Sequence, residues 1–205
     1  MPDIRLTKGE LKKRRDALKQ YNRYLPTLQL KKQQLQMEIL RANASMEERR
    51  RQESAAVHDA QAWSGLLSDS SVRLTQWLTP SGVISGSRNI AGVDIPVFQK
   101  AEFVMAEYDL FLTPLWVDAA IEALRAIASL RAEMRILEEG AAILKRELRT
   151  TTQRVNLFEK VKIPEAEEAI RVIKIYIGDQ MANAVGRSKM AKKKIEAFEM
   201  AAAKP

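Results

Sequence analysis

Few residues in this chain have the types and spacing that catalysis requires. The single histidine, His58, is close in sequence to Asp59 and Glu53, and an imidazole beside a carboxylate could serve as a general base. One histidine cannot form a His-rich metal site, and we interpret His58 as an exposed helical residue. The chain has no Cys, which excludes thiolate catalysis, Cys-ligated zinc and disulfide bonds.

Two further patterns could bind ions. The segment from Gly82 to Gly86 contains two glycines, but no Lys-Ser/Thr pair follows to hold phosphate and magnesium, and we interpret it as a turn. Adjacent acids diverge on a helix and are typically solvated, which weakens a cation site at Glu138 and Glu139 or at Glu165, Glu167 and Glu168. These patterns predict no catalytic residue, no metal site and no cofactor.

A basic cluster near the C-terminus could bind phosphates. It consists of Arg187, Lys189, Lys192, Lys193 and Lys194. Few aromatic residues lie among these cations to stack on bases, and no nucleic-acid motif is present. We therefore favour a solvated helix end and expect no nucleic-acid partner. A nucleic-acid-binding coiled coil is the alternative, and it predicts steeply salt-sensitive retention on DNA.

The composition favours long helices over a compact enzyme core. Of 205 residues, 46% are apolar, 29% charged and 6% aromatic, with only 8 Gly and 7 Pro, which is typical of helices with narrow apolar seams. No apolar run approaches the roughly 20 residues that cross a bilayer, and the N-terminus lacks a signal-peptide core. We therefore expect a soluble cytoplasmic protein without a membrane span.

Charge divides the chain into two basic arms and an acidic centre. Residues 1–51 carry 14 Lys/Arg against 6 Asp/Glu, residues 52–124 carry 3 against 9, and residues 125–205 carry 17 against 11. Since surface potential biases association, the arms and the centre are expected to meet different partners. The alternative is that Lys and Arg simply occupy solvated helical faces.

The apolar spacing predicts two long helices. Thr7 and Glu10 form a capping-box pattern, and a helix is expected from about 8 to 62, bent at Pro26. A second helix is expected from near Pro114 or Val117 to about 185, or further past Gly186. Their heptad positions form a coiled-coil seam, which comprises Leu11, Leu18, Tyr21, Leu25, Leu28, Leu35 and Ile39 in the first helix, and Ile127, Leu130, Met134, Leu137, Leu144, Leu148, Val155, Phe158, Val172 and Tyr176 in the second.

Residues 63–113 differ from both arms. Four of the eight glycines lie here, and apolar residues from Trp63 through Val72 to Leu78 predict one or two short helices. A β-hairpin is expected with strands from Arg88 to Val93 and from Val97 to Val104, and Pro96 limits it to an edge or a turn. The sequence thus predicts a mainly α fold, a long antiparallel two-helix coiled coil with a short helical segment and β-hairpin in mid-chain, in three parts: 1–62, 63–113 and 114–205.

Three stretches resemble the D subunit of the V-type and archaeal-type rotary ATPases. Residues 24–35 are similar to the Leu- and Lys-rich N-terminal helix of that family. A second stretch resembles the central hairpin of the bacterial members and includes Asn89, Ile90, Gly92, Val93 and Pro96. The third and most specific stretch resembles the C-terminal helix signature, with Arg154, Val155, Asn156, Glu159, Ile163 and Pro164.

The resemblance implies a non-catalytic rotor shaft in the central stalk of an ion-transporting ATPase. Such a shaft transmits torque between the hexamer that hydrolyses or makes ATP and the membrane ring that moves protons or sodium. The implied partners are the catalytic A and regulatory B subunits, the small F subunit and the protein that caps the membrane ring, and the implied location is cytoplasmic and peripheral to the membrane. A prefoldin-like chaperone or scaffold is the alternative, although the basic tips of this chain disfavour it.

Overall fold

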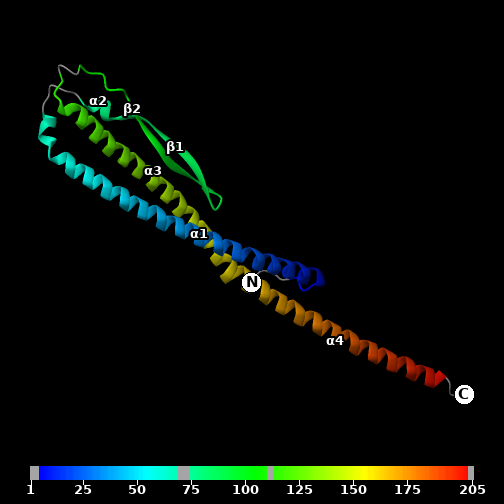
Figure 1. The fold of residues 1–205 in the computed structure, drawn as a ribbon. Helices are drawn as coiled ribbons and strands as arrows, with labels where there is room; N and C mark the ends of the chain where they lie inside the picture. Colours follow the sequence, from blue (N-terminus) through cyan, green and yellow to red (C-terminus); the bar gives the residue numbers. More distant parts are fainter. Residues whose placement is uncertain (1–4, 69–73, 110–112, 203–205) are drawn as a thin grey trace. The chain divides into compact units, whose positions relative to one another are not determined.

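The computed structural model describes residues 5–68, 74–109 and 113–202. It is mainly helical, with two long helices packed antiparallel and a β-hairpin and short helix between them in the chain (Figure 1). The chain divides into two compact units, which we describe separately. The hairpin unit comprises residues 30–152, and the terminal unit comprises residues 1–29 and 153–205.

Helix α1 extends from Lys8 to Gln61, close to the range predicted from the apolar spacing. Thr7 caps its start, because its Oγ1 accepts a hydrogen bond from the backbone N–H of Glu10 at 3.2 Å. The carboxylate of Glu10 accepts instead from Nε of Arg14 at 2.8 Å, so only one half of the predicted capping box forms. The helix continues through Pro26.

The second long helical segment consists of three successive elements without a loop. Helix α3 (Trp116–Leu157) leads into one π-helical turn, η2 (Phe158–Lys162), and then into α4 (Ile163–Ala202). In η2 the backbone N–H of Ile163 bonds to the carbonyl of Phe158, five residues back. Helix thus begins where it was expected, ends later than residue 185, and contains an irregularity that the apolar spacing did not show.

The position of this π turn has a physical reason. Pro164 is the second residue of α4, and a proline ring clashes with the carbonyl four residues back in a regular α-helix. A π turn accommodates one extra residue and moves that carbonyl away. The wider turn therefore lets the helix pass the proline without ending.

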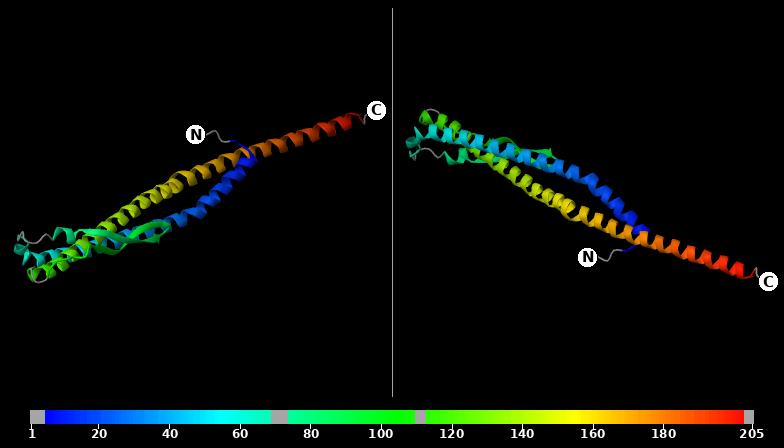
Figure 2. Two further views of the ribbon diagram at one scale, coloured as in Figure 1. Left: turned by 90° about the horizontal axis from the view of Figure 1, so that it is seen from above. Right: turned by 90° about the horizontal axis from the view of Figure 1, so that it is seen from below.

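Within the hairpin unit, charged side chains fix the antiparallel direction of α1 and α3. Residue numbers fall along α3 as they rise along α1 in three ion pairs, which join Lys31 to Glu147 at 2.8 Å, Arg49 to Glu133 at 2.9 Å and Arg131 to Glu53 at 2.6 Å. Figure 1 and Figure 2 show the two helices side by side in this unit. Each pair is partly exposed and contributes at most about 1 kcal/mol, so the apolar contacts hold the helices together.

The predicted hairpin is present, but its turn lies earlier in the chain than expected. Strand β1 (Pro80–Ile90) pairs antiparallel with β2 (Val93–Phe103), and Pro96 lies within β2 opposite Ser87. The turn consists of Ala91 and Gly92, with φ of 51° and 79°. Paired positive φ values match the right-handed twist of the strands, whereas Pro96 needs only an edge position.

Two apolar clusters bind the hairpin and the short elements to the long helices. The first joins α1, α3 and the tip of the hairpin, and consists of buried Leu35, Ile39, Ile90 and Leu144 with partly buried Ala91, Val93, Ile95 and Leu148. The second joins helix α2 (Thr75–Leu78) to the start of α3 through Leu74, Trp77, Val117 and Ile121. A 3₁₀ turn, η1 (Ser64–Ser68), follows α1, while Val72 lies outside the described residues.

Candidate functional site

Arg125 of α3 joins three elements at the base of the hairpin. Its Nε donates to the carbonyl of Trp77 in α2 at 3.0 Å, and its Nη2 donates to the carbonyl of Val104 after β2 at 2.6 Å. The guanidinium also lies over the ring of Phe103, 5.3 Å from the centroid. A planar group with several fixed donors suits this position, so Arg125 holds α2 and the end of β2 on α3.

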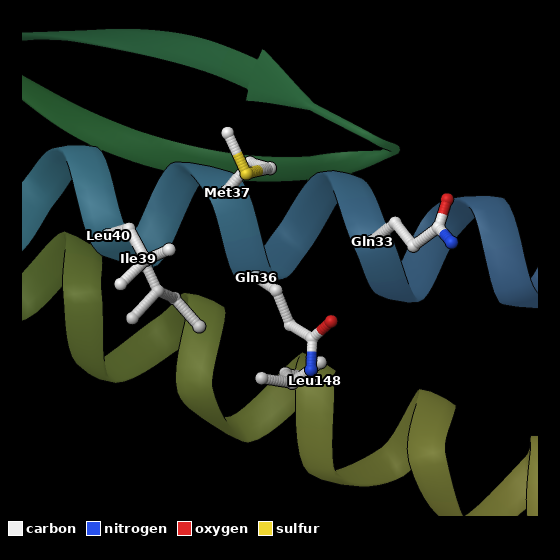
Figure 3. A pocket seen from close by; sticks show the side chains of 6 residues that line it. All are labelled: Gln33, Gln36, Met37, Ile39, Leu40 and Leu148. Carbon is white, nitrogen blue, oxygen red and sulfur yellow. The ribbon is translucent and has the colours of Figure 1, made fainter.

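An apolar groove lies between α1 and α3 in the hairpin unit (Figure 3). Its volume is about 620 Å³, and it is lined by Gln33, Gln36, Met37, Ile39, Leu40 and Leu148. Met37 and Leu40 are 53% and 62% exposed, and the amide of Gln36 lies close to Leu148 in Figure 3. Exposed apolar side chains at helical spacing are typical of a surface that receives another helix. The groove is therefore a candidate protein contact.

The predicted seam residues of the hairpin unit are buried or half-buried, and Leu35, Ile39, Leu144 and Leu148 belong to the cluster that joins α1 to α3. Leu35, Ile39, Ile127 and Leu144 are buried, and the others are half-buried, namely Leu130, Met134, Leu137 and Leu148. Seven-residue spacing predicts a helix interface for the whole set, and the cluster contains Leu35, Ile39, Leu144 and Leu148 of it. The same elements also receive the hairpin, which the spacing alone did not show.

In the terminal unit the seam residues of α1 are half-buried, namely Leu11, Leu18, Tyr21, Leu25 and Leu28. The ring of Tyr21 lies 5.3 Å from that of half-buried Phe158. Val155 is buried at 3% exposure. These contacts bring the start of α1 against the end of α3 and η2.

After η2 the buried apolar residues include Ala169, Ile170 and Ile173, and the last two lie one residue after positions of the seven-residue spacing. Ile170 and Ile173 are buried, whereas Val172 is half-buried and Tyr176 is 40% exposed. The π turn contains one extra residue per turn, and this agrees with the displacement by one position at Ile170 and Ile173, although Ala169 is buried as well. Sequence spacing could have detected the shift only through Pro164.

The residues of the C-terminal signature lie on different faces of the helix. Val155 faces the interior and Ile163 is half-buried, whereas the others are exposed, namely Arg154, Asn156, Glu159 and Pro164. Hairpin residues divide in the same way, since Ile90 is buried, Val93 and Pro96 are half-buried, and Asn89 and Gly92 are exposed. Each set is thus divided between buried and exposed positions.

The last part of α4 exposes large apolar side chains to solvent. Met181, Val185, Ile195 and Phe198 are 54%, 55%, 58% and 76% exposed. Together with Ile177 they recur at steps that place them along one side of a helix. Ile177 is half-buried, whereas no described residue of the terminal unit buries the four exposed positions after it. An apolar stripe of this length is typical of a contact with another protein.

Titratable groups show one clear perturbation. Arg171 donates to Glu168 through Nε at 2.8 Å and Nη2 at 2.6 Å, and these hydrogen bonds lower the pKa of the Glu168 carboxyl. Both side chains are exposed, so the pair is a solvated helical contact. Among the described residues no group of three or more His, Asp or Glu is placed to hold a metal ion.

A family model described as the D subunit of ATP synthase matches residues 10–193. The chain belongs to the family of ATP synthase D subunits. It is 45% identical to the V-type ATP synthase D subunit of Borreliella burgdorferi over 192 residues, which is 94% of this chain and 95% of that protein. The V-type ATP synthase D subunits of Chlamydia pneumoniae and Chlamydia muridarum are 32% and 33% identical over 195 residues, which cover 94% of this chain and 93% and 96% of theirs.

The three stretches predicted a resemblance to the D subunit of V-type ATPases. This prediction is confirmed over nearly the whole chain. Within the described part of this protein, no helix carries an apolar stretch that could span a membrane. The sequence did not single out Arg125, because an arginine that binds neighbouring elements and an arginine exposed to solvent occupy similar positions in a helical sequence. It also missed the groove of Figure 3, since exposed Leu and Met do not disturb a heptad register.

Proposed function

We propose that this D subunit is the central rotor shaft of a V/A-type ATPase. It transmits torque between the hexamer that hydrolyses or makes ATP and the membrane ring that translocates protons or sodium. ATP chemistry takes place at interfaces between A and B subunits and not on this chain. The shaft is part of a membrane-bound complex on its cytoplasmic side. The observation that carries the proposal is family membership over 94% of the chain.

The helical architecture supports this role. A pair of antiparallel helices resists bending better than a single helix, because the seam fixes each helix against the other. Along the seam of the hairpin unit, buried Leu35, Ile39 and Leu144 provide this contact. An asymmetric rod presents different faces to each catalytic interface, and each orientation can then favour a different nucleotide state through differential contacts.

The exposed stripe of α4 supports a contact with the hexamer. Ile195 and Phe198 are exposed apolar residues, and the sequence around them contains the cations Lys192, Lys193 and Lys194. A surface of alternating apolar and charged groups favours weak contacts that can slide, whereas continuous apolar packing would oppose rotation. We assign this segment to the A and B subunits.

The remaining surfaces are assigned to partners that turn with the shaft. The groove of Figure 3, with exposed Met37 and Leu40, is assigned to the small F subunit. The end of the hairpin unit exposes Met105 and Leu115 at 79% and 94%, and we assign it to the protein that caps the membrane ring.

Removal of the chain tests the proposal. The ATPase is purified in vesicles with and without this protein, and ATP hydrolysis and ion transport are measured together. Without the shaft, ion transport driven by ATP should fall to background, because nothing connects the hexamer to the ring. Adding the purified protein back should restore it. An unchanged rate and an unchanged number of ions per ATP after deletion would contradict the proposal.

A further inference from the structure

The two strands of the hairpin differ in how they protect their outer edges. The described sheet has two strands, so each strand has one edge without a strand neighbour. Strand β2 carries Pro96, Asp94, Lys100 and Glu102, and Gln99 is an extra residue opposite β1. Proline, charges and bulges are the features that prevent a strand edge from pairing with another chain. The edge of β2 is therefore protected.

Strand β1 lacks these features over most of its length. Residues 81–87 read Ser-Gly-Val-Ile-Ser-Gly-Ser, with neither a charge nor a proline, and β1 has no extra residue of its own from Gly82 to Ile90. Val83 and Ile84 are 43% and 41% exposed. In an antiparallel pair, alternate residues direct their N–H and C=O groups away from the partner. The outer edge of β1 thus offers a regular row of backbone donors and acceptors.

A groove next to this strand indicates the chemistry of a partner. It has a volume of about 720 Å³, and it is lined by Thr79, Pro80 and Val83 of the hairpin segment and by Ala128, Arg131, Ala132, Arg135 and Ile136 of α3. The lining from Ala128, Ala132 and Ile136 is apolar. Arg131 pairs with Glu53 at 2.6 Å, whereas Arg135 forms no ion pair within the described residues. Its guanidinium is therefore available to a carboxylate, which it can bind through two hydrogen bonds.

We infer that β1 accepts an extended segment of another protein of the ATPase as a third strand, with an apolar side chain in this groove and a carboxylate on Arg135. Backbone hydrogen bonds to the strand edge supply affinity, and the groove and Arg135 supply specificity. A third strand would also stabilise the hairpin, because two isolated strands are only marginally stable in water. The inference rests on the proposed function, since it takes the partner to be a component of the ATPase.

Hydrogen exchange of the backbone amides tests the inference on the purified ATPase and on the isolated chain. In the complex, peptides covering residues 81–88 should exchange at least tenfold more slowly than in the isolated chain, because their outer N–H groups become bonded. Peptides covering residues 97–102 should slow by a smaller factor, because the outer N–H groups of β2 gain no partner. Arg135→Glu should return the exchange of residues 81–88 towards its rate in the isolated chain. Arg146→Glu is the control, because Arg146 is exposed on the same helix outside the groove.

Each contrary result has a separate meaning. Equal exchange of residues 81–88 in the complex and the isolated chain would overturn the inference and leave the shaft proposal intact. Protection that rises with the concentration of the isolated chain would also overturn it, since the third strand would then come from a second copy. Absence of the chain from the purified ATPase would overturn both proposals.

Discussion

At the scale of single residues, the hairpin depends on a few side chains at its two ends. At the tip, Nδ2 of Asn89 donates to Asp94 at 2.7 Å, and its Oδ1 accepts from the N–H of Gly92 at 3.1 Å. At the base, Arg125 binds the carbonyls of Trp77 and Val104. These polar contacts fix the hairpin at both ends, while the apolar cluster around Ile90 holds it on the helices.

Replacing Arg125 tests the base of the hairpin. Arg125→Ala leaves two carbonyls without their charged donor, and such hydrogen bonds contribute about 1.5–3 kcal/mol each. We expect a loss of about 3 kcal/mol in the free energy of unfolding, measured by urea denaturation. Arg146→Ala, at an exposed position of the same helix, should change it by less than about 0.5 kcal/mol. Equal effects of the two changes would show that Arg125 does not hold these elements together.

Replacing Gly92 tests how much the turn at the tip of the hairpin contributes to stability. Its φ of 79° lies in the left-handed region, where a side chain costs about 1–2 kcal/mol. Gly92→Ala should therefore lower the free energy of unfolding by about that amount. Gly82→Ala is the control, because Gly82 has no positive φ and a Cβ there meets nothing within 4 Å. The prediction fails if both alanines lower the stability equally in denaturant unfolding.

At the scale of elements, the sequence predicted those parts that depend on periodicity. The start of α1, the start of α3 and the presence of the hairpin follow from capping and from apolar spacing, which are local properties. The predicted turn lay too late in the chain, whereas the observed turn is at Ala91 and Gly92. Pro96 resembles a turn signal, but an edge strand tolerates a proline. The sequence did not reveal the π turn. One extra residue leaves the number of apolar residues unchanged and shifts only the positions at which they face the interface. The groove of Figure 3 and the contacts of Arg125 depend on tertiary packing, which spacing does not encode.

Single-residue deletions test the account of the π turn. Deleting Lys160 together with Pro164→Ala should convert η2 into regular α-helix and keep Ile170 and Ile173 buried. The free energy of unfolding should then change by less than about 1 kcal/mol. Deleting Glu167 together with Pro164→Ala should instead rotate both isoleucines out of the interface. Each loses about 1.5–3 kcal/mol of burial, so a loss of at least about 3 kcal/mol is expected.

The comparison between these two deletions is made by thermal and urea unfolding followed by circular dichroism. Lys160 and Glu167 are both exposed, so neither deletion removes a buried side chain. Equal losses of stability would mean that η2 does not absorb an extra residue. A large loss on deletion of Lys160 alone, relieved by Pro164→Ala, would agree with the clash assigned to the proline ring.

At the scale of the whole molecule, the shaft proposal assigns some surfaces of the chain to stable contacts and others to sliding contacts. The hairpin unit has defined grooves beside the hairpin and between the helices, which suit partners that stay bound. The last part of α4 has exposed apolar residues such as Phe198 and nearby lysines, which suit a surface that passes successive neighbours. The uneven distribution of charge along the sequence agrees with this division.

Direct observation of rotation tests the shaft proposal best. The ATPase is fixed to a surface through its hexamer, and a bead is attached to this chain at a cysteine introduced in place of Ser54, an exposed residue of α1 in a chain without natural cysteines. On addition of ATP the bead should turn continuously in one direction and stop when ATP is removed. A bead that remains still while the same complexes hydrolyse ATP would contradict the account.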